Sequence, residues 1–401
     1  MSSPSVYDVV VVGAGLMGSS AAYHATLRGK RVLLLEQFEF LHSQGSSHGP
    51  SRIFRVAYSD ATYTKMCIDS LAMWRELEKL TGKKLLEMTG ELDFTRERST
   101  VIDEVAQVLK QCGEPYEVLT PAQVNERFPG FHLPETAHAV YSANAAILNP
   151  TLAMQLMQEL AAKQGAELRD HARVVSLVQQ PLNGEEEGIV VTLADWSVFH
   201  ARQCIVTAGP WTKQLIASQP GGANIDLQPV ATFGTYWKCD PAHEEVYAPS
   251  RFPVFINYDS PEVYGFPLHN RADGIKVCSH KGADVDPEKR QDVTTQPAHL
   301  LASVQDFIKS YMPHVDSNTS TRVDHCMYTM TKDEDFILDF VDAPHASNPS
   351  NKTKKQLVVG AGFSGHGSKM TPVIGKILAD LAIDGQTTYS LDKFKLARLQ
   401  V

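Results

Sequence analysis

The first 37 residues combine two short apolar runs with a helix pattern between them. The runs VYDVVVV at 6–12 and RVLLLEQ at 31–37 have the composition of strands buried on both faces of a parallel sheet. The intervening segment opens with glycines, continues with good helix formers and ends at Gly29, a favourable C-terminal cap. Strand, glycine turn, helix and strand in this order predict one right-handed βαβ unit.

Helical and strand-like patterns continue along the rest of the chain. Apolar positions recur at helical spacing over 64–81, and a second amphipathic pattern begins at Asn149 and stops at Gly165. Strand-like runs follow it, at 173–180, 187–195 and 201–209. Because residues 356–385 repeat the order of strand, glycine-rich turn and helix, we expect the C-terminal chain to complete the N-terminal domain.

The pattern of apolar and polar residues changes at about residue 226. Short alternating or aromatic runs, separated by Asp, Gly and Pro, lie at 253–258, 262–269 and 274–280. This pattern is typical of an antiparallel sheet. We therefore expect a second domain that is inserted into the first.

Composition and charge narrow the classes of function. The 401 residues include 37 Lys and Arg against 46 Asp and Glu, and the net charge of −9 has the wrong sign for a nucleic-acid binder. The six cysteines have no CxxC or CxxH spacing and the histidines form no HxH or HExxH pattern, so we expect no bound metal. The sequence has neither a signal-peptide pattern nor an apolar run of about 18 residues, so we expect no membrane partner.

The glycine turn carries the first candidate chemistry. Gly13, Gly15 and Gly18 match GxGxxG, in which glycines allow a tight turn and a close approach of backbone N–H groups to a pyrophosphate. Glu36 ends the next strand, where its carboxylate can accept hydrogen bonds from ribose hydroxyls. A fortuitous glycine turn is the alternative. The glycine- and serine-rich segment 35–55 interrupts the sheet expected of a nicotinamide dehydrogenase, so we predict FAD.

Four segments together resemble one family. They are LLLEQFEFLHSQGSSHGPSRIFRVAY (33–58), VYGFP (263–267), CMYTMTKDEDFILD (326–339) and GAGFSGHGSKM (360–370). In this order they resemble the monomeric sarcosine oxidase family, including the peroxisomal sarcosine/L-pipecolate oxidases of animals and plants, with the plant-type members closest. The resemblance implies a flavoenzyme that oxidises secondary amino acids, passes the electrons to molecular oxygen and releases hydrogen peroxide.

The resemblance also implies a covalently bound flavin. It places the attachment of FAD, as an 8α-S-cysteinyl thioether, at Cys326, which on its residue type alone would be core filler. It places His48 and Arg52 beside the flavin ring, where otherwise a loop histidine and a solvated charge would be expected. Three glycines are expected to turn backbone amides toward the flavin pyrimidine: Gly362, Gly365 and Gly367.

The substrate carboxylate has two expected partners. The resemblance assigns it to Arg55 and Lys369, and a guanidinium and an ammonium are both suited to holding a carboxylate. Ser368 departs from the family pattern, in which phenylalanine precedes this lysine. The departure leaves Lys369 in place but changes the packing expected around the flavin or the substrate.

A strand-like run carries the remaining candidates. In GIKVCSH, alternation places Lys276, Cys278 and His280 on one face. The resemblance assigns oxygen activation to Lys276 and places His280 and Tyr264 in the active site. Without it, Lys276 would be interpreted as an exposed lysine on a sheet edge and Tyr264 as part of the core.

Pattern and resemblance together predict an α/β fold. Taken over both domains, the chain is expected to be an α+β two-domain flavoprotein. We expect a Rossmann-like FAD-binding domain of the glutathione-reductase type and an inserted antiparallel-sheet substrate domain. The FAD-binding domain is expected over 1–92, 148–225 and 325–401, and the substrate or catalytic domain over 93–147 and 226–324.

The expected reaction is the oxidation of sarcosine, another N-methyl amino acid or L-pipecolate to an imine that hydrolyses, sarcosine giving glycine and formaldehyde. The alternatives are an FAD-dependent dehydrogenase with an acceptor other than oxygen and a flavin-binding protein without turnover.

We expect a monomer. Eukaryotic members of the family are peroxisomal, although RLQV at the C-terminus is not the SKL signal, so the cytoplasm is the alternative compartment.

Overall fold

The structure is a computed structural model, and it describes residues 6–182, 186–219, 222, 225–341 and 356–399. The last two residues of the RLQV sequence lie outside this range. The chain forms two compact units. The first unit comprises Met1–Gly49, Pro150–Pro229 and Met327–Val401, and the second comprises Pro50–Asn149 and Val230–Cys326.

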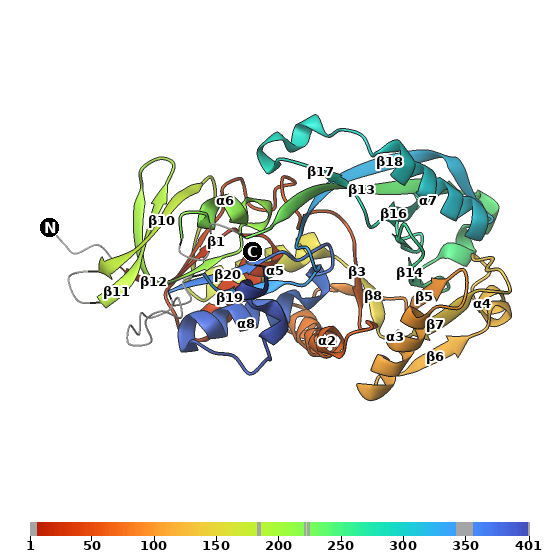
Figure 1. The fold of residues 1–401 in the computed structure, drawn as a ribbon, viewed down its shortest axis with the longest axis horizontal. Helices are drawn as coiled ribbons and strands as arrows, with labels where there is room; N and C mark the ends of the chain where they lie inside the picture. Colours follow the sequence, from red (N-terminus) through yellow and green to blue (C-terminus); the bar gives the residue numbers. More distant parts are fainter. Residues whose placement is uncertain (1–5, 183–185, 220–221, 223–224, 342–355, 400–401) are drawn as a thin grey trace. The chain divides into compact units, whose positions relative to one another are not determined.

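The first unit contains a mixed sheet in the order β10-β11-β12-β1-β2-β9, with β20 beside β12 and β19 beside β20. Its strands are β1 (Val6–Val12), β2 (Val32–Leu35), β9 (Glu167–Arg169), β10 (Val174–Leu182), β11 (Glu186–Leu193), β12 (Val198–Val206), β19 (Ile337–Phe340) and β20 (Leu357–Ala361). The pairs β12–β1, β1–β2, β2–β9 and β12–β20 are parallel. Strands β10, β11 and β12 form an antiparallel meander (Figure 1).

Helices of the first unit cover this sheet. They are α1 (Leu16–Leu27), α5 (Pro150–Lys163), α6 (Thr212–Ile216) and α8 (Thr371–Asp384), with short 3₁₀ helices η1 (Gly209–Trp211), η4 (Ser368–Met370), η5 (Asp392–Phe394) and η6 (Leu396–Leu399). Helices α1 and α8 approach closely because Gly375 has no side chain. A Cβ atom at Gly375 would lie 2.1 Å from Oγ of Ser20 on α1. This contact links residues from opposite ends of the sequence.

The second unit contains two sheets. Its larger sheet has the order β17-β13-β16-β15-β14-β5-β7-β6, with β18 beside β13 (Figure 1). These strands are β5 (Glu91–Thr95), β6 (Tyr116–Leu119), β7 (His138–Ser142), β13 (Gln228–Cys239), β14 (Val254–Asn257), β15 (Val263–Gly265), β16 (Ile275–Ser279), β17 (Ala283–Asp284) and β18 (Val315–Met330). The smaller sheet has the order β3-β8-β4, formed by Arg52–Arg55, Ala145–Leu148 and Leu86–Met88.

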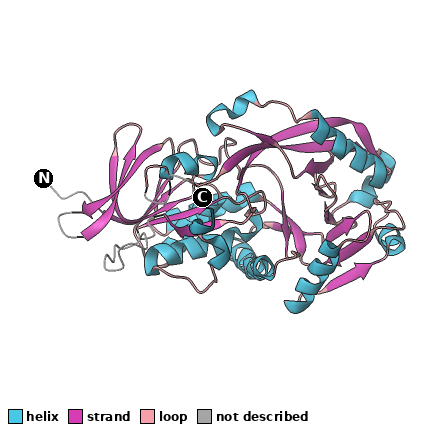
Figure 2. Ribbon diagram, viewed as in Figure 1, coloured by secondary structure: helices cyan, strands magenta, loops and turns pink. Residues whose placement is uncertain are grey.

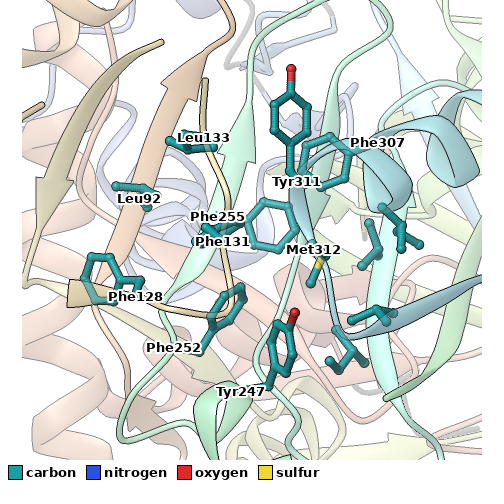
Figure 3. Packing of buried hydrophobic residues seen from close by; sticks show 14 of the residues in the cluster. Leu92, Phe128, Phe131, Leu133, Tyr247, Phe252, Phe255, Phe307, Tyr311 and Met312 are labelled. Atoms are coloured by element: carbon teal, nitrogen blue, oxygen red, sulfur yellow. The ribbon is translucent and has the colours of Figure 1, made fainter. Parts of the chain in front are cut away.

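Helices are interspersed among the strands of the second unit (Figure 2). The helices are α2 (Ala61–Thr81), α3 (Thr100–Gln111), α4 (Pro121–Arg127) and α7 (Ala298–Tyr311), with 3₁₀ helices η2 (Pro241–Tyr247) and η3 (Pro287–Asp292). An aromatic cluster forms the core. Phe255 stacks on Phe307 with ring centroids 5.4 Å apart, and Phe131 stacks on Phe252 at 4.4 Å (Figure 3). Such pairs add to the free energy gained from burying apolar area.

The expectation of an antiparallel sheet is wrong at one pair of strands. β5 and β14 are parallel, with Glu91 opposite Val254 and Phe94 opposite Asn257. The two strands come from the two separate segments of the unit. A hairpin therefore does not connect them, and their relative direction is free to be parallel.

The packing of residues 50–92 also differs from the expected domain boundaries. We predicted this segment in the FAD-binding domain, but its strands pair within the second unit: β3 and β4 with β8, and β5 with β7 and β14. The sequence gives no signal for such long-range pairing.

Within the described ranges, no helix has both the length and the apolar composition needed to span a bilayer.

Candidate functional site

The turn after β1 can accommodate glycine but no larger residue at two of its positions. Gly13 has φ of +96°, and a Cβ atom there would lie 2.5 Å from the carbonyl oxygen of Thr207. A Cβ atom at Gly18 would lie 1.8 Å from the carbonyl oxygen of Gly13. Gly15 is the N-cap of α1, and the first N–H of the helix donates a hydrogen bond to Oγ of Ser47 over 3.1 Å. The alternative of a fortuitous turn does not explain such close packing.

Glu36 holds this turn in place. It lies directly after β2 and is 5% exposed. Its Oε2 accepts a hydrogen bond from the Ala14 N–H over 2.8 Å, and its Oε1 accepts one from the Phe38 N–H over 3.1 Å. His42 Nε2 lies 3.3 Å from Oε1. Because a carboxylate offers about four acceptor positions, Glu36 can still accept hydrogen bonds from ribose hydroxyls.

A cavity of about 270 Å³ opens beside the turn, within the first unit. Gly13, Glu36, Thr207 and Trp211 are among the residues that line it, and they follow the carboxyl ends of β1, β2 and β12. Ligands of open parallel sheets bind at this edge. Close-packed glycines, a buried carboxylate and an aromatic wall fit the adenosine diphosphate half of a dinucleotide.

In the second unit, Ser51 connects two cations. Arg52 donates a hydrogen bond from Nη1 to the Ser51 carbonyl oxygen over 2.8 Å and another from Nη2 to Sγ of Cys326 over 3.3 Å. Nζ of Lys276 donates to Oγ of Ser51 over 3.4 Å. The structure thus brings Arg52, Lys276 and Cys326 together, and their roles at the flavin stay predictions. We call these four residues the Ser51 cluster.

Lys276 is buried in the middle of a sheet. It is 8% exposed, on β16, which pairs with β13 on one side and β15 on the other. The alternative of an exposed lysine on a sheet edge is therefore wrong. Nζ lies 5.1 Å from the ring centre of Phe266 and 5.6 Å from that of Tyr236. Burial lowers the pKa of Lys276, and the charge of Arg52 lowers it further.

Tyr264 and His280 lie side by side next to this strand. Tyr264 is opposite Cys278 in the pairing of β15 with β16. Its ring centroid lies 6.4 Å from that of His280, and the rings are inclined by 73°. The His280 N–H donates a hydrogen bond to the Glu262 carbonyl oxygen over 2.9 Å, which fixes the backbone after β16.

Arg55 ends β3 in a polar cluster that is buried. Its Nη1 donates hydrogen bonds to the Ala57 carbonyl oxygen and to the Tyr258 hydroxyl, the latter over 3.1 Å. Its guanidinium lies over the Tyr58 ring at 4.0 Å, and Nε is 3.6 Å from Oε1 of Glu91. Burial alone would lower the pKa of Arg55, but these tyrosines and carboxylates raise it well above its ordinary value.

The first unit holds the remaining predicted residues. Lys369 is 5% exposed and donates from Nζ to the His366 carbonyl oxygen over 2.9 Å. His48 is half-buried in the segment before β3. Three glycines of the turn after β20 have side chains of neighbouring residues against them: Gly362, Gly365 and Gly367. Arg55 belongs to the second unit, and its joint role with Lys369 stays a prediction.

Sequence reasoning missed four polar residues of these clusters: Ser51, Glu91, Asp93 and Tyr258. In ELDF, Glu91 and Asp93 alternate with apolar residues, a pattern that ordinarily marks a strand with one face in water. The polar face of this strand is instead buried, with both carboxylates at most 1% exposed.

In the part of the chain that the structure describes, no three His, Cys, Asp or Glu side chains are grouped so that they could hold a metal ion.

Comparison with known proteins assigns the family. Residues 8–381 match the family described as FAD dependent oxidoreductase. A probable sarcosine oxidase of Arabidopsis thaliana is 36% identical over 400 residues, covering 98% of this chain and 93% of that protein. A peroxisomal sarcosine oxidase of Homo sapiens is 32% identical, covering 98% and 96%. The chain belongs to the sarcosine oxidase family of FAD-dependent oxidoreductases.

This membership confirms the resemblance that was read from the motifs, and it identifies the chain as an FAD-dependent amine oxidoreductase. The residues around the glycine turn fit the cofactor of the family. A structure of L-proline dehydrogenase from P. horikoshii has a TM-score of 0.79 with 18% identity and covers 98% of each chain. At this identity the similarity concerns the fold alone, and it confirms the predicted fold class.

Proposed function

We propose that this FAD-dependent oxidoreductase oxidises a secondary amino acid and passes the electrons to molecular oxygen. The Ser51 cluster carries the proposal. It places the buried ammonium of Lys276 and the guanidinium of Arg52 on the same serine, next to the thiol of Cys326. Burying a cation is costly, so a protein that merely stored flavin would gain nothing from it. A redox site in which negative charge develops benefits directly.

In this proposal different residues hold different parts of the cofactor. The glycine turn and Glu36 bind the adenosine half, and Cys326 holds the flavin through an 8α-S-cysteinyl thioether. Arg52 fixes the direction of the Cys326 side chain through its hydrogen bond to Sγ. His48 and the turn at 362–367 contribute further contacts to the flavin. When bound, FAD supplies the ring that accepts the electron pair of the substrate.

The substrate is held by its carboxylate at Arg55 and Lys369 and presents its secondary amine to the region of Tyr264 and His280. An amine that enters in the neutral form needs no strong base, so orientation is the main contribution of these side chains. Lys276 acts in the second half of the reaction, where its positive charge stabilises the negative charge that oxygen acquires on reduction.

The reaction balances with water and oxygen as the other reactants. The amine loses two electrons and two protons to give an imine, oxygen gains them to give hydrogen peroxide, and water cleaves the imine. Sarcosine would give glycine and formaldehyde. Other N-methyl amino acids and L-pipecolate share the required secondary amine and carboxylate. We further propose a monomer, and a peroxisomal location by analogy with the human relative.

A screen for peroxide formation tests this proposal. The holoenzyme is supplied with sarcosine, N-methyl amino acids, L-pipecolate and L-proline in air, with the primary amine glycine as the control. We expect peroxide from at least one secondary amine at a rate that exceeds the glycine rate at least tenfold.

Two outcomes would contradict it. Bleaching of the flavin by a secondary amine without peroxide in air would identify a dehydrogenase that uses another acceptor. If no amine bleaches the flavin under anaerobic conditions, the chain binds flavin without turnover.

A further inference from the structure

Two carboxylates face Arg55 from one strand. Glu91 and Asp93 are two residues apart on β5, so their side chains lie on the same face of the sheet. Leu92 and Phe94, which alternate with them, belong to the aromatic core on the other face. Glu91 is 0% and Asp93 1% exposed. The acidic side chains are therefore enclosed within the second unit.

The groups that act on Asp93 come from three further elements. Arg55 ends β3, Tyr258 follows β14, and Glu262 precedes β15. Glu91 lies beside Asp93 on β5 itself. Glu91 approaches the Arg55 guanidinium to 3.6 Å and the charge of Asp93 also acts on it, so two carboxyl groups face one guanidinium, while the third, Glu262, acts on Asp93. We call these five residues the Arg55 cluster.

This excess of acid has a consequence for protonation. A buried region of low dielectric penalises uncompensated negative charge, so one carboxyl group of the pair retains its proton more readily than it would in water. Burial raises the pKa of Asp93 to about 6, against the opposing effect of Arg55. Among the described residues, Oδ1 of Asp93 has no hydrogen-bond partner, so no donor competes with a proton at this oxygen.

A carboxylate that binds Arg55 adds one more negative charge to this cluster. The guanidinium already faces Glu91, so the incoming charge is repelled by the carboxylates as well as attracted by the cation. A proton taken up from solvent by the pair would cancel this repulsion. No covalent bond is made or broken in the step.

We propose that the binding of a carboxylate at Arg55 is coupled to the uptake of one proton by Glu91 and Asp93. Asp93 is then a positioning residue that acts through Arg55 and sets the pH dependence of substrate binding. The inference rests on the proposed function in one respect, namely that Arg55 receives the carboxylate of the substrate.

Proton linkage has a quantitative signature. Where the pair is ionised in the free protein and carries one more proton in the complex, the dissociation constant rises up to about tenfold for each unit of pH. Where the pair is already protonated, the constant is independent of pH. Because the pKa of Asp93 lies at about 6, we expect the dependence to develop above pH 6.

The experiment titrates the holoenzyme with acetate between pH 6 and 8.5 and follows the flavin absorbance. Acetate is ionised throughout this range and carries no amine, so its own protonation does not contribute. Calorimetry at pH 7.5 in two buffers with different ionisation enthalpies counts the protons directly. We expect close to one proton taken up per acetate in the wild type, a measurement that needs no variant.

Variants assign the proton. Asp93→Asn should bind acetate with a constant that changes less than twofold between pH 6.5 and 8.5 and should take up no proton. Glu91→Gln should also reduce the slope and tighten binding at pH 8, because it removes a competing carboxylate. The matched control is Asp306→Asn, which makes the same change at an exposed position of α7 and should behave as the wild type.

The outcomes separate this inference from the proposed function. The coupling is overturned if acetate binds without proton uptake. It is also overturned if the pH dependence of the dissociation constant persists in both variants, because the proton then belongs to another group such as His280. Coupled binding in a protein that oxidises no secondary amine contradicts the proposed function and leaves the coupling standing. Failure of acetate to bind the wild type at any pH overturns the coupling and the assignment of the carboxylate to Arg55, whereas the oxidation itself is decided by the peroxide screen.

Discussion

Arg52 donates a hydrogen bond from Nη2 to Sγ of Cys326 over 3.3 Å, although 274 positions separate the two residues in sequence. The contact joins the beginning of β3 to a residue within β18. It places a guanidinium at the thiol proposed for flavin attachment, and the consequences can be tested one residue at a time.

Replacing Cys326 tests the covalent bond. The wild type should stay yellow after acid precipitation and fluoresce on a denaturing gel, because a thioether survives denaturation. Cys326→Ala should release its FAD to the supernatant. Cys112→Ala, a change at another half-buried cysteine of the same unit, should retain the colour. Release of FAD from the wild type would refute the attachment.

Lys276→Met should separate the two half-reactions. It keeps much of the side-chain length and removes the charge, so reoxidation of the reduced flavin by air should slow by roughly 10² to 10³. Anaerobic reduction by substrate should change little, because the proposed partners of the substrate carboxylate are Arg55 and Lys369. Rapid mixing measures both steps, with Lys309→Met at an exposed position of α7 as the control. Equal slowing of both steps would remove Lys276 from the oxygen reaction.

Gly18→Ala should abolish FAD binding. The added Cβ atom would lie 1.8 Å from the carbonyl oxygen of Gly13, so the turn after β1 must open. Gly45→Ala is a demanding control, since Gly45 lines the same cavity but its Cβ would make ordinary contact at 3.5 Å. The measurement is the flavin-to-protein absorbance ratio after purification. Equal FAD content in the two variants would exclude the turn from cofactor binding.

His24 should make the protein sensitive to acid. Burial on α1, reinforced by the charge of Lys376, lowers the pKa of His24 to about 4 from its ordinary 6.5. Between these values the unfolded chain binds the proton and the folded chain does not, so stability is present above pH 6.5 and is lost as pH falls toward 4. His24→Gln should reduce the loss between pH 7 and 4.5 by about 2 to 3 kcal/mol.

Urea unfolding at the two pH values measures this difference. His299→Gln, at an exposed position of α7, serves as the control. Asp93 acts in the opposite direction, because its raised pKa makes the folded chain the better proton binder between pH 3.8 and about 6. Its contribution is lost as pH rises through 6. An unchanged acid sensitivity in His24→Gln would show that this histidine is solvated.

Local sequence predicted the parts of the fold that depend on neighbouring residues. The run of Val6–Val12, the glycine turn and the first residues of α1 specify their own geometry, because only glycine fits at Gly13 and Gly18. Glu36 follows at the position where a second strand must end.

Other features depend on partners that are far away in the sequence. The parallel pairing of β5 with β14 leaves no local signal in either strand. The burial of Glu91 reverses the ordinary interpretation of alternation, since polar residues on one face of a strand usually meet water. Arg55, on another strand, compensates the negative charge of the buried Glu91 carboxylate. The role of Ser51 depends on two side chains that converge on it from different sheets.

The contact between Ser20 and Gly375 also constrains how the protein is made. Synthesis proceeds from the N-terminus, so α1 leaves the ribosome long before α8, which covers it, has been made. In the same way, β12 is made long before its partner strand β20. Until then the apolar surface of α1 depends on chaperones or on transient contacts for protection. A premature stop anywhere before Thr371 would leave that surface without its partner, and the truncated chain would be directed to aggregation or proteolysis.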